Sequence, residues 1–309
     1  MGCAVSSWFV EVLVLATAAL FQPTPVIRLD PNEVREAVRR ALAEDVGSGD
    51  VTTLACVPPE ATARAVLRAR ESLVLAGLQF AETAFQELSP NLRLVRKAED
   101  GQRLEPDQVV IEVSGQARAI LTAERVALNF VQRLSGVATA TARFVAAING
   151  THANILDTRK TTPGWRSFEK YAVACGGGTN HRLGLFDLVL IKDNHLAALT
   201  DAKPNPIAAA VRQARRAWPS LRVEVEADTV EQVEQAATAG ADIILLDNMS
   251  VENLQRAVQL VAGRAQTEAS GGVRLDRVRA IAETGVDFIS VGAITHSAPA
   301  VDLGLDFLS

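Results

Sequence analysis

Cysteine, histidine and lysine are all scarce in this chain, and each shortage narrows what the protein can be. Three cysteines in 309 residues (Cys3, Cys56 and Cys175) are too few for a disulfide framework or a four-thiolate zinc site, which indicates a reducing compartment. None of the four histidines forms a helical zinc pair with another, so there is no His/Cys metal cluster. Only five of the 31 cationic residues are lysines, and three of these lie between residues 160 and 192. In a chain that otherwise uses arginine, this clustering hints that a compact ammonium group is needed there.

Excess positive charge is also missing. The formal net charge of −5 and the pI of about 5.5 argue against a general nucleic-acid-binding protein. A composition of 48% hydrophobic and 22% charged residues excludes wholesale disorder. The length allows one large domain or two ordinary ones.

A long uninterrupted hydrophobic run is absent as well. The apolar stretch from Trp8 to Phe21 contains Glu11 and is too short for a comfortable membrane span. No basic residues precede it, which weakens a signal-peptide interpretation, although residues 16–18 resemble a cleavage site. The first six residues also match the myristoylation pattern, with Cys3 as a palmitate acceptor. We interpret residues 1–25 as an extension that is disordered or packs as a surface helix.

The first half of the chain reads as a mixed α+β domain. Asp30 and Pro31 make a helix cap and first-turn pair, and the apolar spacing after them predicts a helix over 31–44. Alternating apolar residues predict short strands within 60–77 and 92–115, with a helix over 79–88 between them. A long helix is predicted over 122–148, with a break near Ser135 and Gly136.

After Gly150 the pattern changes to alternating strands and helices. Helices are predicted over 206–217, 229–239, 251–262 and 275–283. Six strand-like runs are predicted over 154–156, 188–191, 222–225, 243–246, 267–269 and 288–291. Buried-type strands that alternate with helices indicate a parallel sheet, either open or closed into a barrel.

Polar or glycine residues follow every one of these six strands. An α/β barrel builds its active site from such strand ends, whereas an open sheet concentrates them at one switch point. The sequence therefore favours an incomplete, six-stranded α/β barrel, preceded by a mixed α+β domain.

The stretch from residue 159 to residue 195 carries a local charge of +3 in a protein of net −5. Such a focused positive field suits a ligand with several carboxylates or phosphates, while a solvated charged face is the alternative. Because Arg159-Lys160 and Lys192-Asp193 directly follow buried-type strands, we favour a binding site. Its candidate cations are Arg159, Lys160, Arg166, Lys170, Arg182 and Lys192, with His181 and His195 in the same stretch.

Two acidic features lie further along. Glu224 and Glu226 alternate on one strand, so both face the same way, and we expect them to face the barrel interior and its mouth. Asp247 ends the next strand. Carboxylates near a phosphate site can hold Mg²⁺ through water or bind sugar hydroxyls, and structural ion pairs are the alternative.

Glycine-rich turns follow the last two strands. Ser270, Gly271 and Gly272, together with Gly292, offer backbone N–H groups where barrels usually bind phosphate. The run 176–178 lacks the lysine of a nucleotide P-loop and is interpreted as a flexible or tightly turned loop. Cys175, Trp165 and Trp218 are interpreted as packing residues.

Taken in order, these motifs resemble the quinolinate phosphoribosyltransferase family, from about Val26 to the C-terminus. The segments that carry the resemblance are 44–45, 49–53, 123–129, 157–164, 169–173, 176–178, 180–182, 190–195, 245–249, 268–272 and 290–293. The resemblance implies that quinolinate and phosphoribosyl pyrophosphate give nicotinate mononucleotide, pyrophosphate and CO₂ with Mg²⁺, as a step of NAD biosynthesis.

The resemblance also implies roles for individual residues. Arg159, Lys160, His181 and Arg182 would hold the two quinolinate carboxylates, joined by Arg125 from the partner subunit of a homodimer. Lys192 would sit near pyrophosphate and substrate, and Glu226 and Asp247 would serve the ribose hydroxyls and the metal. Ser270, Gly271 and Gly292 would cradle the 5′-phosphate. Residues 26–135 would form an N-terminal α+β open sandwich domain, 136–292 the six-stranded barrel, and 293–309 a segment that returns to the first domain.

Three other functions stay open from sequence. A related phosphoribosyltransferase could act on another pyridine or pyrimidine acid, a Schiff-base aldolase could use Lys192, and a binding protein could use the same cleft without catalysis. The sequence favours a cytoplasmic enzyme with no nucleic-acid or membrane partner.

Overall fold

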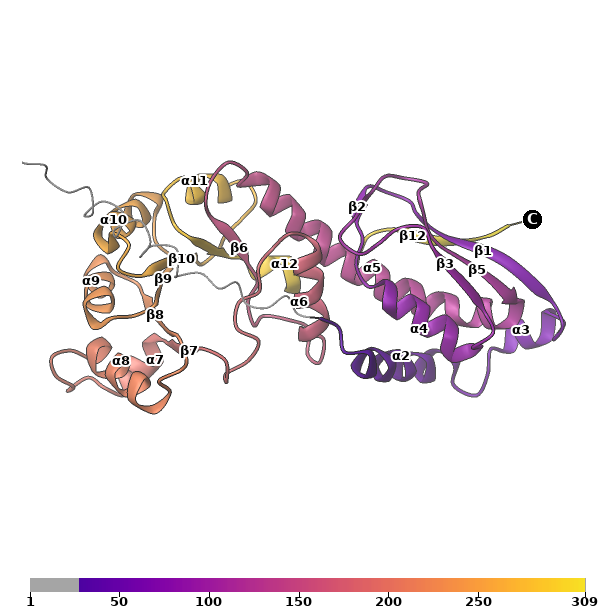
Figure 1. Ribbon diagram of the computed structural model, residues 1–309, viewed down its shortest axis with the longest axis horizontal. Helices are drawn as coiled ribbons and strands as arrows, with labels where there is room; N and C mark the ends of the chain where they lie inside the picture. Colours follow the sequence, from indigo (N-terminus) through magenta and orange to yellow (C-terminus); the bar gives the residue numbers. More distant parts are fainter. Residues whose placement is uncertain (1–27, 309) are drawn as a thin grey trace, which may run out of the picture.

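The computed structural model describes residues 28–308, so the prediction for residues 1–25 lies outside the described residues. The chain forms two parts joined by one long helix (Figure 1). Within the described range, no helix is both long and apolar enough to cross a membrane.

The N-terminal part is a four-stranded antiparallel sheet backed by helices. The strand order is β12-β1-β5-β3, so the last strand of the chain pairs with the first strand of this domain. Helices α4 and α5 pack against each other, and α2 packs on α4. The elements are α2 (Pro31–Val46), α3 (Val51–Cys56), β1 (Thr62–Ala69), β2 (Leu73–Val74), α4 (Leu78–Leu88), β3 (Arg93–Arg96), β4 (Arg103–Leu104), β5 (Val109–Gln116), α5 (Ala117–Ala147) and β12 (Leu303–Leu308).

Local sequence explains where α2 begins. The Asp30 side chain accepts a hydrogen bond from the backbone N–H of Asn32 at 2.8 Å, and Pro31 occupies the first turn. Val34, Val38 and Leu42 form its buried face. The helix predicted over 31–44 is thus confirmed, as is the helix predicted over 79–88.

Helix α5 is one continuous helix of 31 residues, so the predicted break near Ser135 and Gly136 is wrong. Both residues serve close packing instead. The Ser135 hydroxyl accepts a hydrogen bond from the backbone N–H of Ala76 at 2.9 Å. A Cβ atom on Gly136 would lie 2.1 Å from the carbonyl oxygen of Pro299, so only glycine lets this chain segment approach the helix.

The C-terminal part contains six parallel strands in the order β6-β11-β10-β9-β8-β7. All six predicted strands are present, and the predicted helix over 275–283 is shorter. The elements are β6 (Asn154–Leu156), α6 (Arg166–Cys175), β7 (Val189–Ile191), α7 (Asp193–Ala197), α8 (Pro206–Ala217), β8 (Val223–Ala227), α9 (Val230–Ala239), β9 (Ile243–Asp247), α10 (Val251–Val261), β10 (Gln266–Ser270), α11 (Val278–Ala282), β11 (Phe288–Ser290) and α12 (Ala293–His296).

The first strand of this sheet borders the last, as in a barrel, but β6 and β7 do not pair with each other within residues 28–308. On its free side β6 makes only an isolated parallel bridge, between Leu156 and Thr179. The predicted α/β class and six strands are confirmed, and the strands form an open arc rather than a closed barrel.

The two tryptophans differ in their packing. Trp165 stacks on Phe130 with ring centroids 5.0 Å apart, which confirms its packing role. Trp218 is 61% exposed, so the prediction that it packs in the core is wrong. It caps the C-terminal end of α8, beyond the apolar stripe that faces the sheet.

Candidate active site

A cavity of about 580 Å³ lies at the carboxyl ends of the six strands. Of the residues to which the resemblance assigns a role, all but Arg125 and Gly292 line it, so the strand ends converge as the sequence predicts. The further candidates Arg166, Lys170, His195 and Glu224 are not among the lining residues. Its lining consists of Thr158, Arg159, Lys160, His181, Arg182, Leu190, Lys192, Glu226, Leu245, Asp247, Asn248, Glu268, Ser270, Gly271, Gly272 and Ser290.

Part of the cavity lining is cationic. Burial and the nearby Arg159 guanidinium lower the pKa of Arg182. The Nη1 group of Arg182 donates to the carbonyl of Leu188 at 3.2 Å, and Nε of Arg159 is buried with no hydrogen-bond partner. Two adjacent guanidinium groups with a buried, unpaired donor make a site for a carboxylate-rich ligand.

Beneath these arginines lies a group that we call the floor triad: His181, Glu224 and Glu268. Nε2 of His181 is 3.2 Å from a Glu224 oxygen and 3.5 Å from a Glu268 oxygen. Glu224 is completely buried and Glu268 is 1% exposed. Glu224 thus faces the interior, as the strand alternation predicts. Sequence reasoning missed Glu268, although a carboxylate between Thr267 and Ala269 in a buried strand is a visible signal.

Two members of the floor triad, His181 and Glu224, have raised pKa values. Burial opposes ionisation of His181, but Glu268 and Glu224 outweigh it and raise the pKa of His181 to about 10. Burial and the nearby Glu268 charge raise the pKa of Glu224. By distance the three groups could hold a metal ion, but the adjacent charge of Arg182 disfavours a dication there.

A fully buried ion pair holds the segment that carries His181. The ammonium of Lys170 pairs with Asp157 and donates to the His181 carbonyl at 2.8 Å. Asp157 also accepts from the side chain of Asn180 at 2.7 Å and from the backbone N–H of His181 at 2.8 Å. Lys170 is therefore a supporting residue that does not reach the cavity.

Acidic and glycine residues also line the cavity. The ammonium of Lys192, directly after β7, pairs with Glu226 on β8. Asp247 ends the neighbouring strand β9 and accepts from the Asn248 side chain at 2.5 Å. Two carboxylates that line one cavity from adjacent strands are hard oxygen ligands, so this pair fits Mg²⁺ held partly by water and phosphate.

The turn after β10 belongs to this lining. Gly271 has a φ of +95°, and a Cβ atom there would lie 2.1 Å from the Asn248 side-chain oxygen. The turn can therefore lie against Asn248 only with glycine at this position. Gly292 lies behind the lining, where a Cβ atom would be 3.2 Å from Cδ of Lys160.

Arg125 lies elsewhere. It is exposed on α5 and does not line the cavity of its own chain. Cys175 is partly buried, and burial and the charge of Asp100 raise the pKa of its thiol to about 12, which agrees with a packing role.

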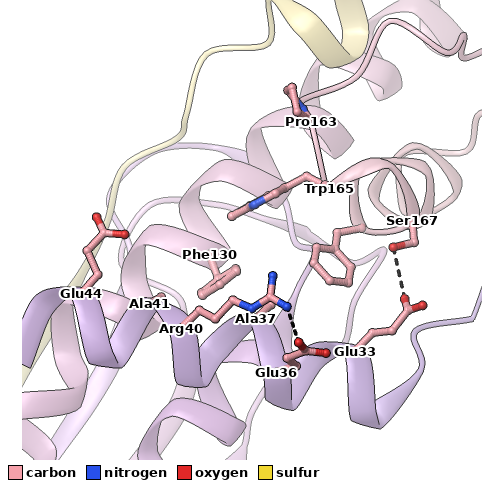
Figure 2. A pocket seen from close by; sticks show the side chains of 12 residues that line it. Glu33, Glu36, Ala37, Arg40, Ala41, Glu44, Phe130, Pro163, Trp165 and Ser167 are labelled. Atoms are coloured by element: carbon pink, nitrogen blue, oxygen red, sulfur yellow. Dashed lines mark hydrogen bonds and ion pairs between the residues drawn. The ribbon is translucent and has the colours of Figure 1, made fainter.

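A second cavity, of about 410 Å³, separates α2 from the loop that leads into α6 (Figure 2). Glu33, Glu36 and Glu44 line its α2 side with Arg40, which pairs with Glu36. Phe130 and Trp165 form the facing wall. Its acidic lining is unsuited to anionic ligands, unlike the cation-lined cavity at the strand ends.

Comparison with known proteins agrees with this arrangement. Residues 50–135 match the model of the quinolinate phosphoribosyl transferase N-terminal domain, and residues 137–306 match that of the C-terminal domain. A nicotinate-nucleotide pyrophosphorylase [carboxylating] of Mycobacterium leprae is 45% identical over 278 residues, covering 88% of this chain and 96% of that protein.

Two further relatives support the match. A probable nicotinate-nucleotide pyrophosphorylase [carboxylating] of Bacillus subtilis is 39% identical and covers 89% of this chain and 93% of its own length. The solved nicotinate-nucleotide pyrophosphorylase from Francisella tularensis superimposes with a TM-score of 0.87 at 40% identity, covering 93% of this chain and 100% of that one. The chain therefore belongs to the quinolinate phosphoribosyltransferase family.

Proposed function

We propose that this protein transfers the phosphoribosyl group of phosphoribosyl pyrophosphate to quinolinate and releases CO₂, forming nicotinate mononucleotide and pyrophosphate in NAD biosynthesis. The observation that carries this proposal is that one cavity is lined both by a cationic group, with Arg159 and Arg182, and by an acidic and glycine-rich group, with Glu226, Asp247 and Gly271. The first suits a dicarboxylate, and the second suits a phosphorylated sugar.

In the first group, Arg159, Lys160 and Arg182 bind the two quinolinate carboxylates. His181 has a different role and does not bind the carboxylates. Its Nδ1 accepts the backbone N–H of Arg182 at 2.7 Å and its Nε2 faces the two glutamates, so neither nitrogen is free for the ligand. We assign His181 to orienting the segment that carries Arg182.

In the second group, the N–H groups and hydroxyl of Ser270 and Gly271, with Gly292 behind them, hold the 5′-phosphate. Lys192 lies where it can neutralise the departing pyrophosphate. Glu226 and Asp247 hydrogen-bond the ribose hydroxyls and stabilise positive charge that develops on the sugar carbon. When Mg²⁺ is bound by these carboxylates and the pyrophosphate, it supplies further neutralisation of the leaving group.

Loss of CO₂ follows from the same chemistry. Attack of the pyridine nitrogen on the sugar carbon displaces pyrophosphate and makes the ring cationic. The ring then holds the electron pair of the breaking C–C bond at C2 as CO₂ leaves, and C2 takes a proton from water to give nicotinate mononucleotide. The protein positions and neutralises the reactants without a covalent intermediate. Lys192 is held in an ion pair with Glu226 as an ammonium, which disfavours the alternative of a Schiff-base aldolase.

Two wider features belong to the proposal. We place Arg125 in the partner's site of a homodimer, since it is exposed and outside its own cavity. We also place the enzyme in the cytoplasm, in line with its scarce cysteines.

Acceptor competition tests the proposed reaction. The protein, Mg²⁺ and phosphoribosyl pyrophosphate are incubated with quinolinate, nicotinate or orotate, and nucleotide formation is followed by chromatography. We expect nucleotide formation with quinolinate at least a hundredfold above the other two. Preferred use of a monocarboxylate acceptor would overturn the assignment and favour the related phosphoribosyltransferase.

A further inference from the structure

We propose that Arg166, the first residue of α6, is a positioning residue for quinolinate: its guanidinium joins the two loops that carry Arg159 and Arg182 and so fixes the spacing of these two side chains. This inference rests on the proposed function, because it concerns how the same cavity holds the two carboxylates of quinolinate.

Two loops, one before and one after α6, carry the cationic side chains that face each ligand carboxylate. We call residues 157–165, between β6 and α6, the Arg159 loop, and residues 176–188, between α6 and β7, the Arg182 loop. A dicarboxylate held by both arginines spans the two loops. Its affinity therefore depends on how firmly the loops are held at one spacing before the ligand arrives.

Arg166 contacts both loops, and each of its three guanidinium nitrogens donates a hydrogen bond. In the Arg159 loop, Nε donates to the Thr161 hydroxyl at 3.1 Å and Nη2 to the Arg159 carbonyl at 3.4 Å. In the Arg182 loop, Nη1 donates to the Leu183 carbonyl at 3.1 Å. Arg166 does not line the cavity, so it acts on the ligand through the loops that it joins.

The buried ion pair of Lys170 makes a similar connection one helical turn later. Lys170 lies four residues after Arg166, pairs with a carboxylate of the Arg159 loop, and donates to the His181 carbonyl in the Arg182 loop. His181 and Leu183 are the two chain neighbours of Arg182. Helix α6 therefore holds the backbone on both sides of Arg182, through Lys170 on one side and Arg166 on the other.

The turn that follows Arg182 is held together internally, so one contact from outside can place it. The Asp187 carboxylate accepts from the backbone N–H groups of Leu183 and Gly184, at 2.6 and 3.0 Å. Arg166 donates to the carbonyl of the same Leu183. This contact sets the position of the whole turn relative to the Arg159 loop.

The side chain of Arg159 depends on the same support. Its Nε is buried and has no hydrogen-bond partner within residues 28–308. Its direction is therefore governed by its backbone, whose carbonyl Arg166 holds.

Arg166→Lys tests this role, because lysine keeps the positive charge but replaces three nitrogens in a fixed fork with one ammonium. We expect the KM for quinolinate, and its Kd measured by calorimetry without phosphoribosyl pyrophosphate, to rise on the order of thirtyfold. The KM for phosphoribosyl pyrophosphate should change by less than about twofold, because Arg166 contacts none of the residues assigned to that substrate.

The matched control is Arg279→Lys. Arg279 also joins a helix to a backbone carbonyl, that of Asn149 at 2.7 Å, but this contact precedes β6 and so lies away from the carboxyl ends of the strands. The same replacement there should alter neither KM. Thr161→Val is the second variant, should Arg166→Lys fail to fold. It removes one acceptor of Arg166 and should raise the KM for quinolinate about threefold.

The outcomes separate the two proposals. Wild-type affinity for quinolinate in a folded Arg166→Lys would mean that the charge alone suffices, and equal losses for both substrates would mean a general effect on the fold. Either result would overturn the positioning role. Failure of the wild-type protein both to bind and to turn over quinolinate would instead overturn the proposed function, and this inference with it.

Discussion

At the scale of single residues, the cavity depends on buried charges that never reach its surface. Lys170 and Asp157 are both completely buried and together fix the backbone at His181. From the sequence, Lys170 is one of the few lysines and lies in a cationic stretch. Whether it contacts the ligand cannot be predicted from sequence, because this depends on the direction in which that face of α6 points. Glu268 could not be predicted as a site residue for a similar reason, because its neighbours His181 and Glu224 come from the loop before β7 and from β8, which are distant in sequence.

Lys170→Met should destabilise the protein by about 3–5 kcal/mol, because it leaves Asp157 buried without its partner. The free energy of unfolding from urea titration measures this. The double variant Lys170→Met/Asp157→Asn removes both charges and should regain a large part of the loss. A single variant as stable as the wild type would mean that the pair contributes nothing.

The floor triad gives a second prediction at this scale, in the pH dependence of stability. The pKa of His181 rises from its ordinary 6.5 to about 10 in the folded chain, so the folded state binds more protons in that range. The stabilisation is therefore complete below pH 6.5 and is lost as the pH rises toward 10. Stability curves for wild type and His181→Gln between pH 6 and 10 should differ in slope, the variant falling less steeply. Parallel curves would contradict the shift.

At the scale of elements, periodicity and capping residues predicted most helices and all six strands of the parallel sheet. The errors arise where tertiary contact overrides local preference. Gly136 is read as a helix breaker in isolation, but in the fold it is the point where the segment around Pro299 touches α5. Trp218 is read as a core residue, but it follows the end of α8 and is largely exposed.

Gly136→Ala tests this contact, because the sign of the change in stability separates a steric clash with Pro299 from a gain in helix propensity. Alanine normally stabilises a helix interior by about 1 kcal/mol relative to glycine. Here the added methyl group would overlap the Pro299 carbonyl, so we expect a net loss of about 1–3 kcal/mol. Thermal denaturation measures the change, with Arg143→Ala compared with Arg143→Gly, at an exposed position of the same helix, as the control for propensity alone. If Gly136→Ala were more stable than the wild type, the segment around Pro299 would have to move away from the helix at little cost, and the predicted clash would be wrong.

At the scale of the whole molecule, the two domains are interleaved. The chain leaves the first domain through α5, builds the parallel sheet, and returns so that β12 pairs with β1 (Figure 1). Arg125 lies on α5, outside the cavity of its own chain, and no single-chain property of the sequence could place it in a site.

Mixing two inactive variants tests whether Arg125 acts in the partner subunit. Arg125→Ala and Lys192→Ala should each abolish nicotinate mononucleotide formation. If one site takes Lys192 from one subunit and Arg125 from the other, subunit exchange should restore about a quarter of wild-type activity, because half of the dimers are mixed and each has one intact site. No recovery after confirmed exchange would place Arg125 in its own subunit's site or outside catalysis.

The most direct test of the central proposal is the fate of the substrate's 2-carboxylate. Quinolinate labelled with ¹³C at that carboxylate is incubated with the protein, Mg²⁺ and phosphoribosyl pyrophosphate. The proposed reaction predicts equimolar labelled CO₂, pyrophosphate and unlabelled nicotinate mononucleotide. A nucleotide that retains the label, or no nucleotide formed by the folded protein, would contradict it.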